Sequence, residues 1–217
     1  MRTQIVMFDG VEELDVFAPL EVLGCAAALG HDVETSLVAL RPGRVAARYG
    51  TELMAGRSLA SADADVVVVP GGGYANKAAR GTWAQIQQGT LPGALRDAVR
   101  PGLTFASVCS GAMLLAAAGV TEGRPCTTHH SARDDLVASG GEWIDARVVD
   151  DGNLVTSGGV TSGLDLVLWL VERHLGARAA ADVEHFLEYE RRGTVWKSAQ
   201  QSPSRTPIRT SGRSRLG

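Results

Sequence analysis

Cysteine, aromatic residues and long apolar runs are all scarce in this sequence of 217 residues. The three cysteines, Cys25, Cys109 and Cys126, are odd in number and widely spaced, which argues against a disulfide framework or a zinc knuckle and favours a reducing compartment. No apolar run reaches the ~20 residues that cross a bilayer, and the N-terminus lacks a signal-peptide pattern. These absences predict a cytoplasmic protein without membrane contact, bound metal or disulfides.

Acidic residues are absent after Glu190, where seven of the 21 basic residues of the chain are found. The part before that point carries 14 basic against 24 acidic residues. A chain of this length suits one domain, which we expect over residues 1–190. Residues 191–217 are rich in serine, proline and arginine and predict a basic tail that is disordered or extended. Contact between this tail and nucleic acid or another acidic surface is the alternative.

Short apolar runs alternate with helical patterns along residues 1–190. The run of valines at 66–69 is typical of a central parallel strand that is buried on both faces. The alternation predicts an α/β fold with a doubly wound, mainly parallel sheet and helices on both faces. Strands are expected at 5–8, 33–40, 64–69 and 103–108, hairpins at 44–54 and 146–157, and helices at 19–29, 82–99, 110–118, 131–139, 160–175 and 177–190.

Cys109 lies where a buried strand is expected to turn into a helix, in the segment Ser107-Val108-Cys109-Ser110-Gly111. This context is typical of a nucleophile elbow, which exposes its side chain at the carboxyl edge of the sheet. The helix N-terminus beside it would favour the thiolate over the thiol. A buried structural cysteine is the alternative.

Two other segments are expected at the same edge of the sheet. The first is Pro70-Gly71-Gly72-Gly73, whose backbone amides would lie beside the elbow. We predict that the amides of Gly72 and Ser110 stabilise the negative charge that develops on a substrate, although a simple glycine-rich turn is the alternative. The loop Gly158 to Gly163 follows a strand as well and predicts either a pocket rim or close packing.

The second segment is the acidic stretch Glu12-Glu13-Leu14-Asp15, which follows the first strand. Asp15 stands between apolar residues, so we expect its carboxyl group to be buried, with a raised pKa and a partner. A thiol at position 109 is such a partner. Acids that simply favour a helix N-terminus are the alternative.

These three segments, in this order, resemble the ThiJ/PfpI superfamily, whose fold is similar to the flavodoxin-like, class I glutamine amidotransferase-like fold. The likeness extends over roughly residues 3–190. It implies a catalytic cysteine at Cys109, an acid at Asp15 and a homodimer. Most relatives have Glu where this chain has Asp15, and the protease- and deglycase-like members have His where it has Ser110.

Both departures resemble the isonitrile (isocyanide) hydratase branch, as do the segments Thr127-Thr128-His129 and Gly158-Gly159-Val160-Thr161. This resemblance implies a cofactor-independent lyase that adds water to a small isocyanide through a Cys109 thioimidate and gives an N-substituted formamide. Asp15 would act first as acid and then as base. His129 matches the family histidine near the pocket, where it could help to bind substrate.

Two other functions stay open at this point. One is a glyoxalase- or deglycase-like activity on reactive carbonyl compounds with the same cysteine and acid. The other is a redox-sensing or regulatory domain that uses oxidation of Cys109. The partners expected are a small-molecule substrate and a second copy of the chain, and no cofactor is expected.

Overall fold

Four consecutive valines form the centre of the sheet. In the computed structural model, which describes residues 1–198, strand β6 (Val66–Val69) is buried and pairs in parallel with β1 (Arg2–Val6) and β7 (Thr104–Ser107). The eight strands are ordered β12-β10-β11-β7-β6-β1-β2-β5, and β10 with β11 is their antiparallel pair. The remaining members of this sheet are β2 (Glu34–Ala39), β5 (Arg57–Ser58), β10 (Val148–Asp150), β11 (Leu154–Ser157) and β12 (Trp196–Lys197).

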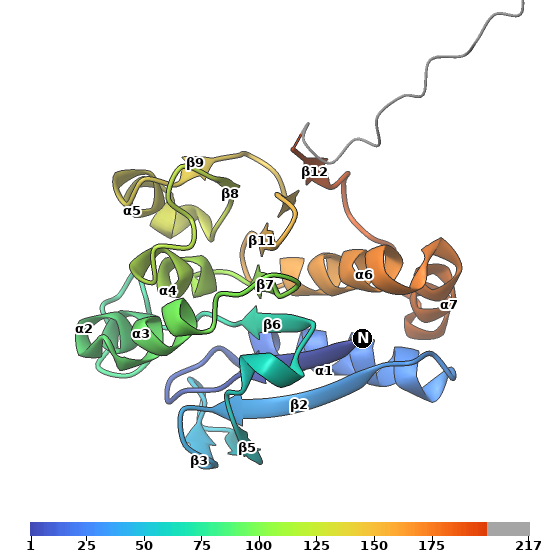
Figure 1. The fold of residues 1–217 in the computed structure, drawn as a ribbon, viewed down its shortest axis with the longest axis horizontal. Coiled ribbons are helices and arrows are strands. Elements are labelled where there is room, and N and C mark those ends of the chain that lie inside the picture. Colours follow the sequence, from blue (N-terminus) through green and yellow to red (C-terminus); the bar gives the residue numbers. More distant parts are fainter. Residues whose placement is uncertain (199–217) are drawn as a thin grey trace, which may run out of the picture.

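Helices cover both faces of this sheet (Figure 1). Helices α1 (Glu13–Ala28), α6 (Ser162–Leu175) and α7 (Ala177–Leu187) pack against one another on one face. On the other face lie α2 (Thr82–Gln88), α3 (Thr90–Asp97) and α4 (Gly111–Ala117), with α5 (Arg133–Ala138) against α4. This arrangement confirms the predicted doubly wound α/β fold.

Smaller elements complete the structure. The predicted hairpin around residues 44–54 is confirmed as β3 (Gly43–Ala46) paired antiparallel with β4 (Glu52–Ala55). Strands β8 (Pro125–Cys126) and β9 (Glu142–Trp143) form a separate parallel pair. Single 3₁₀ turns lie at Ser61–Asp63 and His130–Ala132. No helix among residues 1–198 combines the length and apolar character that a membrane crossing requires.

Two predicted helix boundaries are wrong. Helix α1 begins at Glu13, so that Pro19 lies inside it and not in its first turn. A proline at that position has no N–H group for the carbonyl of Asp15, four residues earlier, and the helix tolerates this loss. The expected helix over 82–99 is divided at Gly89, whose φ of 74° ends α2 in the left-handed conformation and starts α3.

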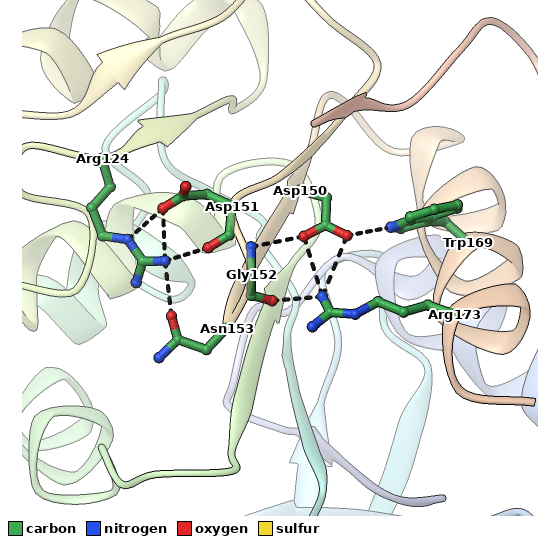
Figure 2. Close-up of polar contacts among 7 residues, drawn as sticks. All are labelled: Arg124, Asp150, Asp151, Gly152, Asn153, Trp169 and Arg173. Atoms are coloured by element: carbon green, nitrogen blue, oxygen red, sulfur yellow. Dashed lines mark hydrogen bonds and ion pairs between the residues drawn. The ribbon is translucent and has the colours of Figure 1, made fainter. Parts of the chain in front are cut away.

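Buried charge secures the turn between β10 and β11 on the side of α6. Asp150 is fully buried, and its carboxylate accepts hydrogen bonds from Trp169 Nε1 at 2.8 Å and from Arg173 at 3.2 and 3.3 Å. Arg173 also donates to the carbonyl of Gly152 at 2.5 Å (Figure 2). Helix α6 therefore holds the turn through the side chain of Asp150 and the backbone carbonyl of Gly152.

A second arginine holds the same turn from the side of β8. Arg124 donates to the Asp151 carboxylate at 2.8 Å, to the Asp151 carbonyl at 2.6 Å and to the Asn153 side chain at 2.8 Å (Figure 2). The turn therefore lies between two guanidinium groups from separate elements. This arrangement fixes β11, which leads directly into the loop beside Cys109.

The packed part of the chain continues past the expected boundary at residue 190. Arg191 forms ion pairs with Glu172 at 2.5 Å and Glu184 at 2.6 Å, and strand β12 then pairs with β10. Residues 191–198 thus pack on the domain, because Arg191 meets acids on α6 and α7 and β12 extends the sheet. The rest of the expected tail, residues 199–217, lies outside the described residues.

Candidate active site

Cys109 occupies the sharp turn between β7 and α4, as predicted. Its φ of 57° lies in the left-handed region, which is strained for a residue with a side chain. The turn is held by a hydrogen bond from the Cys109 N–H to the carbonyl of Gly158 at 2.9 Å. Glycine at position 111 allows α4 to start this close to β6, because a Cβ there would collide with the carbonyl of Val69.

Asp15 and the glycine-rich segment meet at this turn because β1, β6 and β7 are neighbours and end at the same edge of the sheet. The Asp15 carboxyl group is fully buried in the first turn of α1, and its Oδ2 accepts a hydrogen bond from the Gly71 N–H at 2.9 Å. The N–H of Glu12 donates in return to the Gly71 carbonyl at 2.8 Å. The first bond holds the carboxyl group, and the second ties the start of α1 to the glycine-rich segment.

Burial raises the pKa of Asp15 to about 7. The hydrogen bond from Gly71 opposes this rise, the negative charge of Glu12 adds to it, and contact with the Cys109 thiol opposes it again. The expectation of a buried carboxyl with a raised pKa is confirmed. Such a group exchanges its proton near neutral pH, as an acid that later acts as a base must.

The expected thiolate at Cys109 is corrected by the structure. Burial, and then the nearby charge of Asp15, raise the pKa of the Cys109 thiol to about 12. The backbone N–H groups of Val160 and Ser110 oppose the rise but do not cancel it. Because the two groups interact, thiol and carboxyl titrate as a pair, and the first proton leaves the pair near neutral pH. Because the thiol has the higher pKa, the remaining proton stays on the sulfur, and the Asp15 carboxylate can accept it as the sulfur reacts.

The predicted pair of amides lies beside the thiol, but one of the two is engaged. The N–H of Gly72 donates to Ser110 Oγ at 3.0 Å, and that hydroxyl donates to Thr82 Oγ1 at 3.4 Å. The backbone N–H groups of Ser110 and Val160 both form hydrogen bonds with the Cys109 sulfur. A role for Gly72 and Ser110 in charge stabilisation stays a prediction.

A cavity of about 250 Å³ opens next to Cys109. It contains the predicted residues Gly72, Ser110 and His129, together with residues that the sequence did not single out. The latter include Glu12, Arg48, Tyr74 and Val160. A larger cavity of about 640 Å³ lies near the ends of β1 and β2 and is lined by neither Cys109 nor Asp15.

The loop after β11 combines the two alternatives left open for Gly158 to Gly163, a pocket rim at Val160 and close packing at Gly159 and Gly163. Val160 lines the cavity and has a φ of 36°, a strained conformation for a β-branched residue. Gly159 has no room for a Cβ, because the ring of His129 packs directly on it. No sequence pattern indicates that Val160 would adopt this conformation.

His129 lies at the cavity as a neutral ring. Burial, and then the neighbouring His130, lower its pKa. Its Nδ1 accepts a hydrogen bond from the Ser131 N–H at 3.2 Å and lies 2.8 Å from the Ser131 hydroxyl. With Nδ1 accepting, the neutral ring carries its proton on Nε2 and is a donor there. Within residues 1–198 no cluster of three or more potential metal ligands is found.

The strand order and the cysteine turn place the chain in the flavodoxin-like, class I glutamine amidotransferase-like fold. Within that fold, the chain belongs to the DJ-1/PfpI family, whose sequence pattern matches residues 1–173. The resemblance drawn from the three motifs is thereby confirmed.

Several relatives carry names of enzymes. The chain is 33% identical over 190 residues to the isonitrile hydratase of Pseudomonas putida, covering 87% of this chain and 78% of the relative. It is 30% identical over 175 residues to a deglycase of Thermococcus kodakarensis, covering 79% of this chain and 96% of the relative. Among solved structures, DJ-1beta of Drosophila melanogaster superposes with a TM-score of 0.74 at 27% identity, over 87% of this chain and 98% of that one. The family thus contains enzymes of different specificity.

Proposed function

We propose that this protein is an isonitrile hydratase, a cofactor-independent lyase that converts a small isocyanide and water into an N-substituted formamide. The observation that carries the proposal is the contact between the Asp15 carboxyl group and the Cys109 thiol. A buried carboxyl group with a pKa of about 7 is the acid and base that faces the thiol. Ser110, the residue after the nucleophile, holds its hydroxyl against Gly72 and offers no imidazole base.

The first step adds the thiol across the terminal carbon of the substrate. As the sulfur of Cys109 bonds to that carbon, its proton passes to the Asp15 carboxylate. The carbon, which now carries the electron pair, takes the proton back from Asp15 and gives the thioimidate R–N=CH–S–Cys109. One carbon thus gains a bond to sulfur and a bond to hydrogen, and no oxidant or reductant is needed.

The second step releases the product. Asp15 accepts a proton from water as the water oxygen attacks the thioimidate carbon, and then passes this proton to the nitrogen. The C–S bond breaks as the hydroxyl proton of the intermediate is transferred to the sulfur through Asp15, which yields R–NH–CHO and returns the thiol. The same carboxyl group can act in both directions at neutral pH because its pKa is about 7. Gly72, Ser110 and the Nε2 proton of His129 are proposed to bind the substrate at this stage.

Formamide production by the purified chain tests this proposal. Cyclohexyl isocyanide is the probe, and the product is quantified by chromatography. Wild type should form the formamide, Cys109→Ser and Asp15→Asn should lose at least about a hundredfold in rate, and Cys126→Ser should retain activity as the matched buried-cysteine control. Absence of turnover in wild type, or an active Asp15→Asn variant, would contradict the proposal.

A deglycase- or glyoxalase-like activity is the second candidate, and the Thermococcus relative favours it. Incubation with methylglyoxal distinguishes the two, because a glyoxalase would produce lactate where a hydratase would not. Redox sensing is supported less, because sensor cysteines have a low pKa and good exposure. Burial instead raises the pKa of Cys109 and leaves its side chain 7% exposed.

We also propose that the chain forms a homodimer, as the family resemblance implies. Leu14 and Phe17, one turn apart on α1, are both 38% exposed, and apolar side chains in such positions are typical of an interface. Light scattering after gel filtration should give twice the monomer mass of 22.7 kDa. Phe17→Glu should shift the protein towards the monomer if α1 lies in the contact.

A further inference from the structure

The loop between β3 and β4 reaches across the sheet edge to the candidate active site. The Arg48 N–H donates to the Val11 carbonyl at 2.9 Å, and the Tyr49 N–H donates to Glu13 Oε1 at 2.7 Å. The Gly10 N–H donates to the Ala46 carbonyl at 2.8 Å. These bonds dock the hairpin on the segment that leads into α1, and none of them was foreseen from the sequence.

Docking places a guanidinium group against a buried acid in the wall of the cavity. Arg48 Nη1 lies 2.6 Å from Glu12 Oε2, and both residues line the cavity beside Cys109. The Glu12 side chain is only 8% exposed, whereas that of Arg48 is 42% exposed. A buried carboxylate needs such a partner, because an unpaired charge loses its hydration without compensation.

We propose that Arg48 is a positioning residue, which holds Glu12 in an ion pair and thereby sets the pH at which Asp15 and Cys109 become reactive. This inference rests on the proposed roles of Asp15 and Cys109 but not on the identity of the substrate. Without Arg48, Glu12 would lose the cation that pairs with it and would leave an uncompensated acid in the cavity wall, close to the buried Asp15.

Charged and titratable groups from three elements act on Asp15. The segment before α1 supplies Glu12, the hairpin supplies Arg48, and the elbow supplies the Cys109 thiol. The ring of His129, from the loop before α5, lines the same cavity and is itself influenced by the ion pair. The charge of Glu12 raises the pKa of Asp15, and that of Arg48 lowers it. Removing either partner should therefore move the titration of Asp15, in opposite directions.

The experiment measures how fast iodoacetamide alkylates Cys109 between pH 5 and 9, with the modified peptide quantified by mass spectrometry. Alkylation needs no substrate and reports the loss of the first proton from the pair. Arg48→Gln should raise the midpoint by roughly half to one pH unit, and Glu12→Gln should lower it by a similar amount. Arg48→Lys keeps the charge and should restore most of the wild-type midpoint.

Arg44→Gln is the matched control. Arg44 lies on the same hairpin in an ion pair with Glu52 at 3.3 Å, but both side chains are highly exposed and outside the cavity. Its removal should leave the midpoint unchanged. Circular dichroism and thermal unfolding confirm that each variant is folded, and Glu12→Gln provides the test if Arg48→Gln is not.

The outcomes separate this inference from the proposed hydratase activity. A uniform rise in alkylation rate at every pH, without a change of midpoint, would mean that Arg48 only closes the cavity and would overturn the inference. Opposite midpoint shifts in Arg48→Gln and Glu12→Gln would support it, even if no isocyanide were consumed. If isocyanide is consumed, the pH profile of kcat/KM should move in the same directions.

Discussion

Replacing Asp15 with asparagine should stabilise the folded protein at alkaline pH. The amide oxygen of the new side chain could still accept the hydrogen bond from the Gly71 N–H that Asp15 Oδ2 accepts at 2.9 Å. The replacement would differ from the native residue in having no charge to bury. Apart from the contact of this carboxyl group with the Cys109 thiol, Asp15 Oδ1 has no hydrogen-bond partner within residues 1–198, so the ionised form is only partly compensated there.

The magnitude follows from the pKa of Asp15, which is raised from 3.8 to about 7. Between these values the folded protein binds the proton more tightly than the unfolded chain does, so the free energy of unfolding decreases as the pH rises. Each pH unit is worth about 1.4 kcal/mol, and the full loss is on the order of 4 kcal/mol above pH 7. Asp15→Asn should recover much of this at pH 8 and little at pH 4.5. The thiol contributes only above its ordinary pKa and does not affect this window.

Urea unfolding at both pH values, followed by circular dichroism, measures the effect. Asp65→Asn is the control of opposite sign, because hydrogen bonds from Arg2 lower the pKa of Asp65 and its charge stabilises the fold. That variant should be destabilised about equally at pH 8 and pH 4.5, because both values lie above the ordinary pKa of Asp65. If Asp15→Asn changed the free energy of unfolding equally at both pH values, or lowered it at pH 8, the reasoning would be refuted.

Two further predictions concern packing and buried charge. Gly111→Ala should destabilise the fold by about 3 kcal/mol or more, because its Cβ would collide with the backbone of β6. Gly93→Ala, which has open space around it on α3, should instead stabilise the fold by roughly 0.5–1 kcal/mol. Thermal unfolding of both variants compares the two effects. Arg173→Ala should lower the free energy of unfolding by about 3 kcal/mol, because it weakens the compensation of the buried Asp150 carboxylate. Arg178→Ala, which removes an exposed ion pair, should lower it by less than about 1 kcal/mol. Equal decreases in chemical denaturation would contradict this prediction.

The sequence was sufficient to predict the positions of those site residues that directly follow strands. Cys109, Asp15 and Gly72 lie close to the ends of β7, β1 and β6, and continuous apolar runs made those strands recognisable. Adjacent parallel strands bring such positions together without any further information. The thiolate was wrongly expected, because the effect of a helix N-terminus is visible in a sequence, whereas the burial that outweighs it depends on tertiary packing.

Other features depended on contacts between distant segments. Arg48 carries no motif, and its place at the cavity results from hydrogen bonds between the hairpin and the segment before α1. The N–H of Val160 faces the sulfur only because its backbone adopts a rare conformation. Gly89 gave a visible signal, since a glycine in the middle of a predicted helix favours an end at that point.

The position of β12 has a practical consequence for anyone who shortens this protein. A deletion beginning at residue 191 would leave Glu172 and Glu184 without their shared cation and would uncover the backbone of β10. An uncovered strand at the margin of a sheet is a template for association with other chains. A shortened form must therefore retain residues 191–198, which keep that margin covered.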